Sequence, residues 1–328
     1  ARWRVLSSVS SSSSPHRCAS RVLAAASYFW FWMALLLFFF IVLQHSVFGS
    51  VKYPTSIKNV VSRMTQAMQK GLQARISRME VELPPGVDFG VELGDRKSRQ
   101  EKAKLSDTER ILNSNREVAR LFTEMFSSIQ TSTTVAFPTE SAAFEARNLW
   151  SAQFRGTVVS IDTPGQKGYG KLRSRKFSLA EQEQALMASD DGLYVPDNTE
   201  VLILPGARPR DWKKIRKLHE RLGDGTVIIA VNTKAQVAAS KEELKESDRE
   251  FFFDTFSPIM HYAPPPLLQK TNRELLMYFE FGSNDNQWTV AEKARGGSGF
   301  MAMPAKENFK TIWEGSKRPG TEELSALI

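Results

Sequence analysis

The sequence predicts an α/β fold, a layered domain with a mostly parallel sheet, and residues 200–232 carry this prediction. Residues 200–206 (EVLILPG) and 226–232 (TVIIAVN) are short apolar runs, rich in β-branched residues, and each ends at a turn former. Strands that are apolar at every position are typical of a parallel sheet that helices cover on both faces. Between these runs, apolar residues recur at helical spacing up to Gly223, where the helix is expected to end. A strand, a helix and a second strand predict one parallel crossover unit.

Helices and strands also alternate in the chain before this unit. Residues 57–72 carry one apolar stripe at helical spacing and predict a helix, with Thr55 or Ser56 as its N-cap. Residues 79–83 alternate apolar and acidic side chains, which indicates a short strand. Ser106 begins a capping box for the next helix. A strand at 133–137, a helix ending near Trp150 and a strand at 157–161 follow. This steady alternation predicts one α/β domain.

The chain after the crossover unit predicts a C-terminal β-hairpin. Residues 235–246 indicate a helix, and the densely aromatic residues 251–262 are expected to lie mostly in the core. Residues 275–281 and 287–290 flank a turn at 282–286 and predict the hairpin. Two short helices are expected to end the chain.

The N-terminal residues predict targeting or membrane insertion. Residues 1–27 are rich in Ser, Ala and Arg and lack acidic residues, which is typical of an organellar transit peptide. Residues 28–43 are almost wholly apolar and aromatic at one end, which favours a transmembrane anchor. The alternative is a signal peptide that starts at Met33 and is cleaved. The expected organisation is therefore an arm at 1–27, the transmembrane or signal segment at 28–49, the α/β domain at 50–318 and a tail at 319–328.

The charge and the cysteine content exclude several classes of function. The chain has 328 residues and a net charge of +8, but the first acidic residue is Glu80, and residues 80–328 hold 34 basic and 36 acidic side chains. The basic excess therefore lies in the N-terminal part, and a nucleic-acid groove on the body is not expected. The single cysteine, Cys18, excludes an internal disulfide and a thiolate metal site.

One phosphate-loop candidate follows the strand at 157–161. Gly165, Gly170 and Lys171 match the G-x-x-x-x-G-K part of the motif, in which backbone amides hold phosphate and the lysine reaches its outer oxygens. Leu172 stands where Ser or Thr would bind magnesium, so the match is incomplete. Open α/β sheets bind ligands at the carboxyl ends of their strands, which adds Gly206 and Asn232 as candidate cofactor-binding residues.

No catalytic or metal site is predicted, and no cofactor is expected. Asp190, Asp191 and Asp197 lie in a polar loop, where carboxylates are usually solvated. His219 falls on the charged face of its helix and is interpreted as a surface residue. His261, between Met260 and Tyr262, is interpreted as a packed strand residue rather than a base.

The succession of landmarks after residue 53 resembles a known family. YPTS, GLQARISRMEVELPPG, RLFTEMF, VAFPTESAAFEA, EVLILPG, VIIAVN, FFFDTFSPIMHYAP and a closing hairpin with Trp288 occur in this order. They are similar to a plant and algal family of a domain of unknown function, which includes the stromal low photosystem II accumulation assembly factor. The resemblance implies a plastid location, a Rossmann-like body and a role in photosystem biogenesis, and it supplies no catalytic residues.

The expected function is therefore non-enzymatic. We expect a plastid protein, at the thylakoid membrane or in the stroma, that binds a photosynthetic membrane complex as an assembly factor or accessory subunit. The apolar segment at 28–43 departs from largely soluble relatives and is interpreted as an anchor or as part of a two-step import signal. The alternative function is a nucleotide- or cofactor-binding enzyme with a Rossmann-like domain.

Overall fold

Nine strands form one sheet in the order β3-β2-β4-β5-β1-β6-β7-β8-β9. The computed structural model describes residues 53–89, 105–151, 153–162, 195–233, 245–266, 273–283, 286–293 and 309–327. The strands are β1 (Arg78–Glu82), β2 (Thr133–Phe137), β3 (Thr157–Ser160), β4 (Val201–Pro205), β5 (Val227–Val231), β6 (Ser257–Ala263), β7 (Leu275–Glu280), β8 (Trp288–Lys293) and β9 (Phe309–Gly315).

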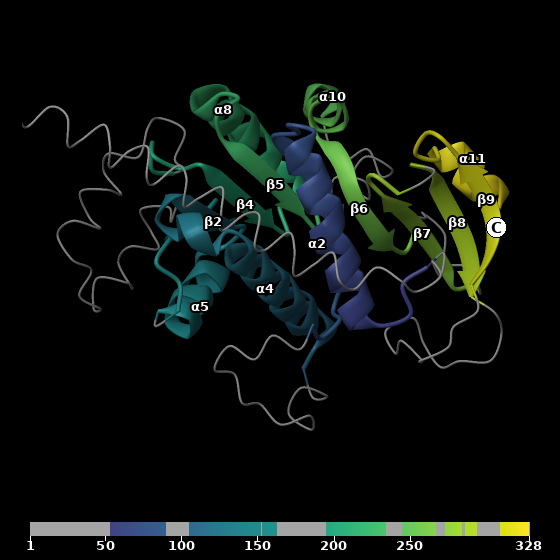
Figure 1. The fold of residues 1–328 in the computed structure, drawn as a ribbon, viewed down its shortest axis with the longest axis horizontal. Helices are drawn as coiled ribbons and strands as arrows, with labels where there is room; N and C mark the ends of the chain where they lie inside the picture. The colour runs from purple at the N-terminus through teal and green to yellow at the C-terminus, as the bar shows by residue number, and fades with distance from the viewer. Residues whose placement is uncertain are drawn as a thin grey trace, which may run out of the picture. The chain divides into compact units, whose positions relative to one another are not determined.

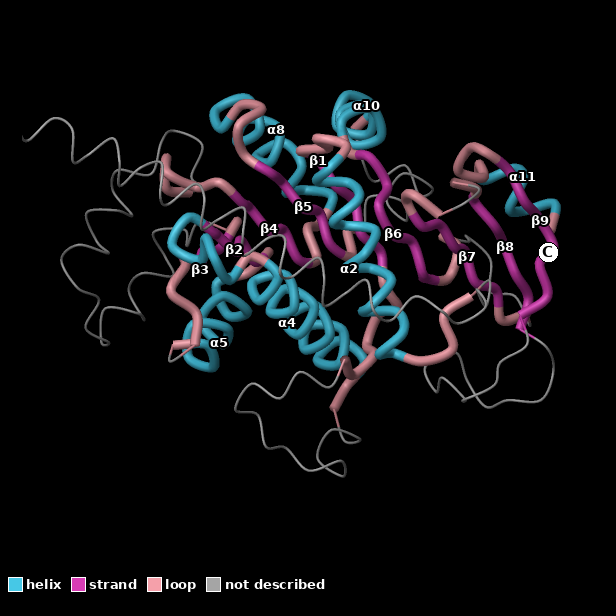
Figure 2. The backbone as a smooth tube through the Cα atoms, in the orientation of Figure 1, coloured by secondary structure: helices cyan, strands magenta, loops and turns pink. Residues whose placement is uncertain are grey.

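The sheet is parallel from β3 to β6 and antiparallel from β6 to β9. The predicted crossover unit is confirmed, because β4 and β5 pair in parallel with Val201 opposite Val227. The predicted hairpin is also confirmed, since β7 and β8 pair antiparallel. The fold is therefore α/β, with a mostly parallel sheet that continues into C-terminal antiparallel strands. Figure 1 draws the strands as arrows, and Figure 2 marks the helices and strands along the backbone.

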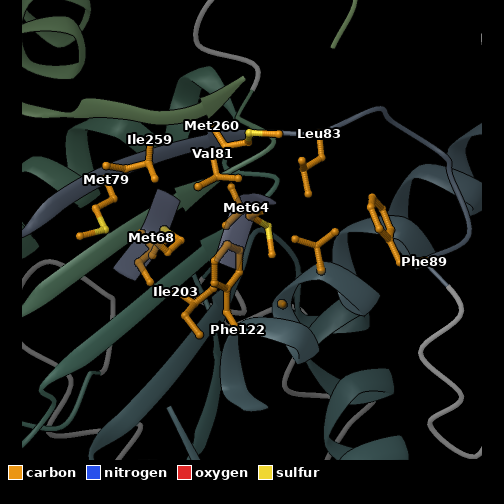
Figure 3. Packing of buried hydrophobic residues seen from close by; sticks show 14 of the residues in the cluster. Met64, Met68, Met79, Val81, Leu83, Phe89, Phe122, Ile203, Ile259 and Met260 are labelled. Carbon is orange, nitrogen blue, oxygen red and sulfur yellow. The ribbon is translucent and has the colours of Figure 1, made fainter. Parts of the chain in front are cut away.

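Helices cover both faces of the parallel part of the sheet (Figure 1). On one face, α2 (Ile57–Gln73), α4 (Asp107–Met125) and α5 (Glu140–Trp150) pack on the larger core cluster. On the other face, α8 (Trp212–Leu222) and α10 (Glu246–Thr255) pack on a second cluster around Trp212. Figure 3 shows the first cluster, in which side chains from helices and strands interdigitate: Met64, Met68, Met79, Val81, Leu83, Phe89, Phe122, Ile203, Ile259 and Met260.

Local sequence signals place the helix ends as predicted. Ser56 caps α2, and its hydroxyl accepts a hydrogen bond from the amide of Asn59. Ser106 and Glu109 form the capping box that begins α4. Two short 3-10 helices, η1 (Ser127–Ser132) and η2 (Pro209–Asp211), lead into β2 and α8.

The C-terminal elements differ from the prediction. One of the two expected short helices is a strand, β9, which pairs with β8; the other is the helix α11 (Thr321–Ala326). Thr311, Ile312 and Trp313 favour a strand, and pairing with the edge of β8 satisfies their backbone groups. The helix predicted at 235–246 lies almost wholly outside the described residues, and the helix that follows, α10, takes up the first part of the aromatic stretch.

The described residues, from 53 onward, include no helix that is long and apolar enough to cross a membrane. The N-terminal arm and the apolar segment at 28–49 lie outside them.

Candidate functional site

The strand order creates a switch point between β2 and β4. The chain leaves β2 through α5 toward β3 on one side, and leaves β4 through α8 toward β5 on the other. The two helices lie on opposite faces of the sheet, and ligands of open α/β sheets bind at the carboxyl ends of strands at such a point.

Arg208 joins the strand ends at this switch point. Its Nε donates to Asp211 Oδ2 at 2.9 Å, and its second terminal nitrogen lies 2.8 Å from Asp162 Oδ1. The same nitrogen donates to the carbonyl of Pro138, directly after β2. Arg208 therefore links the ends of β2 and β3 to the start of η2, and the carboxylates of Asp162 and Asp211 balance its charge.

The two predicted strand-end residues, Gly206 and Asn232, meet around Asn115 of α4. Both have left-handed backbones, with φ of 68° and 48°. The Asn232 amide oxygen accepts from the amide of Leu83 at 2.7 Å, and its Nδ2 donates to Asn115 Oδ1 at 2.9 Å. The side chain of Asn232 therefore links β1, β5 and α4.

Gly206→Ala is expected to destabilise the protein by about 1–3 kcal/mol, because a left-handed Cβ is strained and would lie 2.5 Å from Asn115 Nδ2. Gly223→Ala tests the backbone strain alone, since φ is 62° and no atom lies within 4 Å of the added Cβ. Urea unfolding measures both variants. A loss in Gly206→Ala below about 1 kcal/mol would show that Asn115 yields freely.

The other candidate cofactor residues, Gly165, Gly170 and Lys171, lie outside the described residues, as do Asp190 and Asp191. Asp197 is exposed, in agreement with a solvated loop. Within the described ranges, no group of three or more His, Cys, Asp and Glu side chains is placed to hold a metal ion.

The interpretation of His219 as a surface residue holds only in part. Its side chain is half-buried, and its Nδ1 accepts a hydrogen bond from Arg78 Nε at 2.7 Å. Its ring also contacts Phe251, at 5.4 Å between ring centroids. Burial and the Arg78 charge lower the pKa of His219. The basic residues around His219 indicated a solvent-exposed face of α8. The side chain of Arg78, on β1, extends to this face and covers part of His219.

Sequence reasoning missed a buried polar cluster on the α8 and α10 face of the sheet. It consists of Glu80 and Glu82 on β1, Thr233 after β5, His261 on β6 and Arg318 after β9, and we call it the carboxylate cluster. Glu80 and His261 are each 2% exposed, and Glu82 is 9% exposed. The acidic residues that alternate with apolar ones at 79–83 were the only sign of this cluster in the sequence. Such alternation is typical of a strand with one solvent-exposed face, whereas all five residues of β1 are buried.

Glu82 and His261 lie side by side in the carboxylate cluster, because they are register partners in the parallel pairing of β1 and β6. The Glu82 Oε1 accepts a hydrogen bond from Thr233 Oγ1 at 3.1 Å. Burial, and then the charge of Glu80, raise the pKa of Glu82 well above its ordinary value. A raised pKa keeps the Glu82 carboxyl protonated beyond its usual range, so it can both donate and accept hydrogen bonds.

His261 is a packed strand residue, as interpreted from the sequence, but its polar atoms are unsatisfied. Neither ring nitrogen has a hydrogen-bond partner in the described part of the chain. Its ring lies 5.3 Å from that of Trp288, which in turn stacks on Phe279 at 4.8 Å. Burial, and then the charge of Arg318, lower the pKa of His261 well below its ordinary value. The imidazole is therefore neutral and offers one donor and one acceptor.

Arg318 covers the outer side of the carboxylate cluster. Its guanidinium forms an ion pair with Glu80, and its own side chain is 19% exposed. The guanidinium carbon lies 4.7 Å from the centre of the Trp288 ring and 5.5 Å from that of Phe253. Stacking on the aromatic rings fixes Arg318 above the glutamate. The arrangement supplies one bound ion pair, one carboxyl group and one neutral imidazole at the carboxyl ends of β1, β5 and β6.

A comparison with family models gives one match. The family described as Domain of unknown function (DUF1995) matches residues 54–326, which include every described helix and strand. No curated protein and no solved structure matches the chain.

Proposed function

The chain belongs to the family described as Domain of unknown function (DUF1995), and on that premise we propose that it is a non-enzymatic plastid protein. It acts at the thylakoid membrane or in the stroma, where it binds a photosynthetic membrane complex as an assembly factor or accessory subunit. The observation that carries this proposal is the ordered succession of landmarks from YPTS to the hairpin with Trp288, which, apart from Tyr53, lies within the residues that the family model matches.

Two further features support the proposal. The acid-free arm and the apolar segment at 28–43 have the composition of an import signal and a membrane anchor. Arg208 at the switch point and Asn232 at the end of β5 are engaged with the protein's own strands and helices. Such an arrangement suits a rigid body that presents its surface to a protein partner.

Deletion of the gene is expected to lower the accumulation of a photosystem, because an assembly factor or accessory subunit limits the yield of the complex it serves. Immunoblots of the photosystem core subunits in the deletion strain measure this, and reintroduction of the intact gene is the control. Unchanged amounts of every photosynthetic complex would contradict the proposal. Co-sedimentation with the mature complex identifies a subunit, whereas co-sedimentation with incomplete forms only identifies an assembly factor.

The parent strain, which contains the protein, tests membrane association. Washed membranes are extracted with alkaline carbonate, and the start of the native polypeptide is determined by mass spectrometry. Retention in the pellet with residues 28–43 present indicates an anchor. Release into the wash with a start near Ser50 indicates a cleaved import signal and a soluble factor.

A nucleotide- or cofactor-binding enzyme is the second candidate, which the switch point between β2 and β4 favours. Its candidate ligand contacts are Gly165, Gly170, Lys171, Gly206 and Asn232. A nucleotide at 100 times its dissociation constant would stabilise the protein by about 2.7 kcal/mol. A melting shift that Lys171→Ala abolishes would favour this candidate, and no shift with any common nucleotide would exclude it.

A further inference from the structure

Glu82 lacks a cationic partner in the carboxylate cluster. Arg318, the cation that acts on this carboxyl group, already forms its ion pair with Glu80. Among the described residues, no salt bridge reaches Glu82, and Thr233 Oγ1 provides its side-chain hydrogen bond. A buried carboxylate without a partner costs several kcal/mol, so a proton neutralises it instead. The carboxyl proton of Glu82 thus occupies a position that a cation can take.

His261 provides an independent observation beside the same carboxyl group. It is 2% exposed, is the register partner of Glu82, and leaves both ring nitrogens without a hydrogen-bond partner in the described part of the chain. Such a side chain costs about 1–3 kcal/mol for each buried unsatisfied group. Native proteins leave few such groups, and those that persist often belong to functional sites.

We propose that Glu82 and His261 form a binding site for the ammonium group of a small primary amine. The site lies where β1, β5 and β6 end, which is where open α/β sheets hold their ligands. It lies on the face covered by α8 and α10. The inference is independent of the plastid location and of the protein partner.

The chemistry of an ammonium group matches the acceptors of this site. An ammonium ion has three N–H donors and one positive charge. The Glu82 carboxylate supplies the negative charge and two acceptor oxygens, and the neutral imidazole of His261 supplies a lone pair. Arg318 remains on Glu80, so the site gains one charge pair. No group of side chains in the described residues is placed to hold a metal ion, which favours an organic cation.

Binding of an amine is expected to release one proton from Glu82, since the burial that raises the pKa of this carboxyl keeps it protonated in the free protein. The affinity for methylammonium should therefore rise with pH, by at most about tenfold per pH unit, as long as the free protein keeps Glu82 protonated. We would titrate methylammonium chloride into the full chain in a mild detergent by calorimetry, at constant ionic strength. Two amine-free buffers with different heats of ionisation give the number of protons released.

Glu82→Gln keeps the shape of the side chain but cannot ionise, and it should lower the affinity at least about tenfold and abolish proton release. His261→Phe keeps the ring against Trp288 and should weaken binding by a similar factor while proton release persists. Glu322→Gln, on the exposed face of α11, is the matched control and should bind as the parent does. Binding without pH dependence, binding unchanged in Glu82→Gln, or no heat with methylammonium would overturn the proposal, as would tighter binding of potassium than of methylammonium.

Discussion

Arg318→Leu is expected to lower the free energy of unfolding at pH 7 by about 3–5 kcal/mol, because it removes one partner of a buried ion pair. Glu80, which is 2% exposed, loses the guanidinium that neutralises it. The leucine keeps apolar contact with Trp288 and Phe253, so the loss reports the charge rather than a cavity. Urea unfolding of the full chain in detergent, followed by tryptophan fluorescence, measures the change.

Two further variants decide whether the ion pair is the cause. Glu80→Gln combined with Arg318→Leu removes both charges and should recover most of the loss, because no buried charge remains. Arg249→Leu breaks the pair with Glu246 on α10, whose side chains are 45% and 67% exposed, and should cost less than about 1 kcal/mol. If Arg318→Leu costs no more than Arg249→Leu, Arg318 does not stabilise the cluster.

Local patterns in the sequence were sufficient to predict α2, α4, α5, α8 and the strands β1 to β5, but not α10. The stripe at 57–72 and the capping box at Ser106 specify α2 and α4 because helix periodicity and caps are properties of neighbouring residues. The apolar runs of β4 and β5 specify a buried parallel pair for the same reason. At β9 the prediction was wrong, because pairing with β8 is a tertiary effect that short-range propensity does not contain.

The carboxylate cluster could not be predicted, because its members come from distant parts of the chain. Glu80 and Arg318 are separated by 238 positions, and Glu82 and Thr233 by 151. The acidic alternation of β1 indicates an exposed face until β6 and Arg318 are placed against it. The interpretation of His261 as packed was confirmed, but only the burial of both ring nitrogens shows that the packing leaves them unsatisfied. Asn232 lies at the carboxyl end of β5, where the strand-end rule placed it, and its role in binding a cofactor stays a prediction.

His261→Phe is expected to stabilise the protein, and the gain should grow as the pH falls. At pH 7 it removes two unsatisfied buried nitrogens, each of which costs about 1–3 kcal/mol. Burial lowers the pKa of His261, so the folded protein keeps it neutral while the unfolded chain takes up a proton below about pH 6.5. The contribution of His261 to the free energy of unfolding of the parent therefore decreases as the pH falls, by about 1.4 kcal/mol per pH unit. His261→Phe has no imidazole to protonate and does not show this decrease. At pH 5 the difference between variant and parent should exceed that at pH 7 by up to about 2 kcal/mol.

Glu82 has the opposite effect on the pH dependence of stability, so the contributions of Glu82 and His261 can be separated by varying the pH. Its raised pKa means that the fold keeps a proton that the unfolded chain loses above about pH 4.3, so stability from Glu82 falls as the pH rises. Between about pH 4.3 and pH 6.5 the two slopes therefore have opposite signs in the parent. In His261→Phe, the free energy of unfolding should fall as the pH rises. In Glu82→Gln it should rise with pH, and in the double variant it should not change with pH.

Overpacking by the larger phenylalanine would change the free energy of unfolding equally at every pH, so the test uses the slope of stability against pH. Urea unfolding in amine-free buffers from pH 4.5 to pH 7.5 measures them, and parallel curves for the parent and His261→Phe would contradict a neutral, buried imidazole.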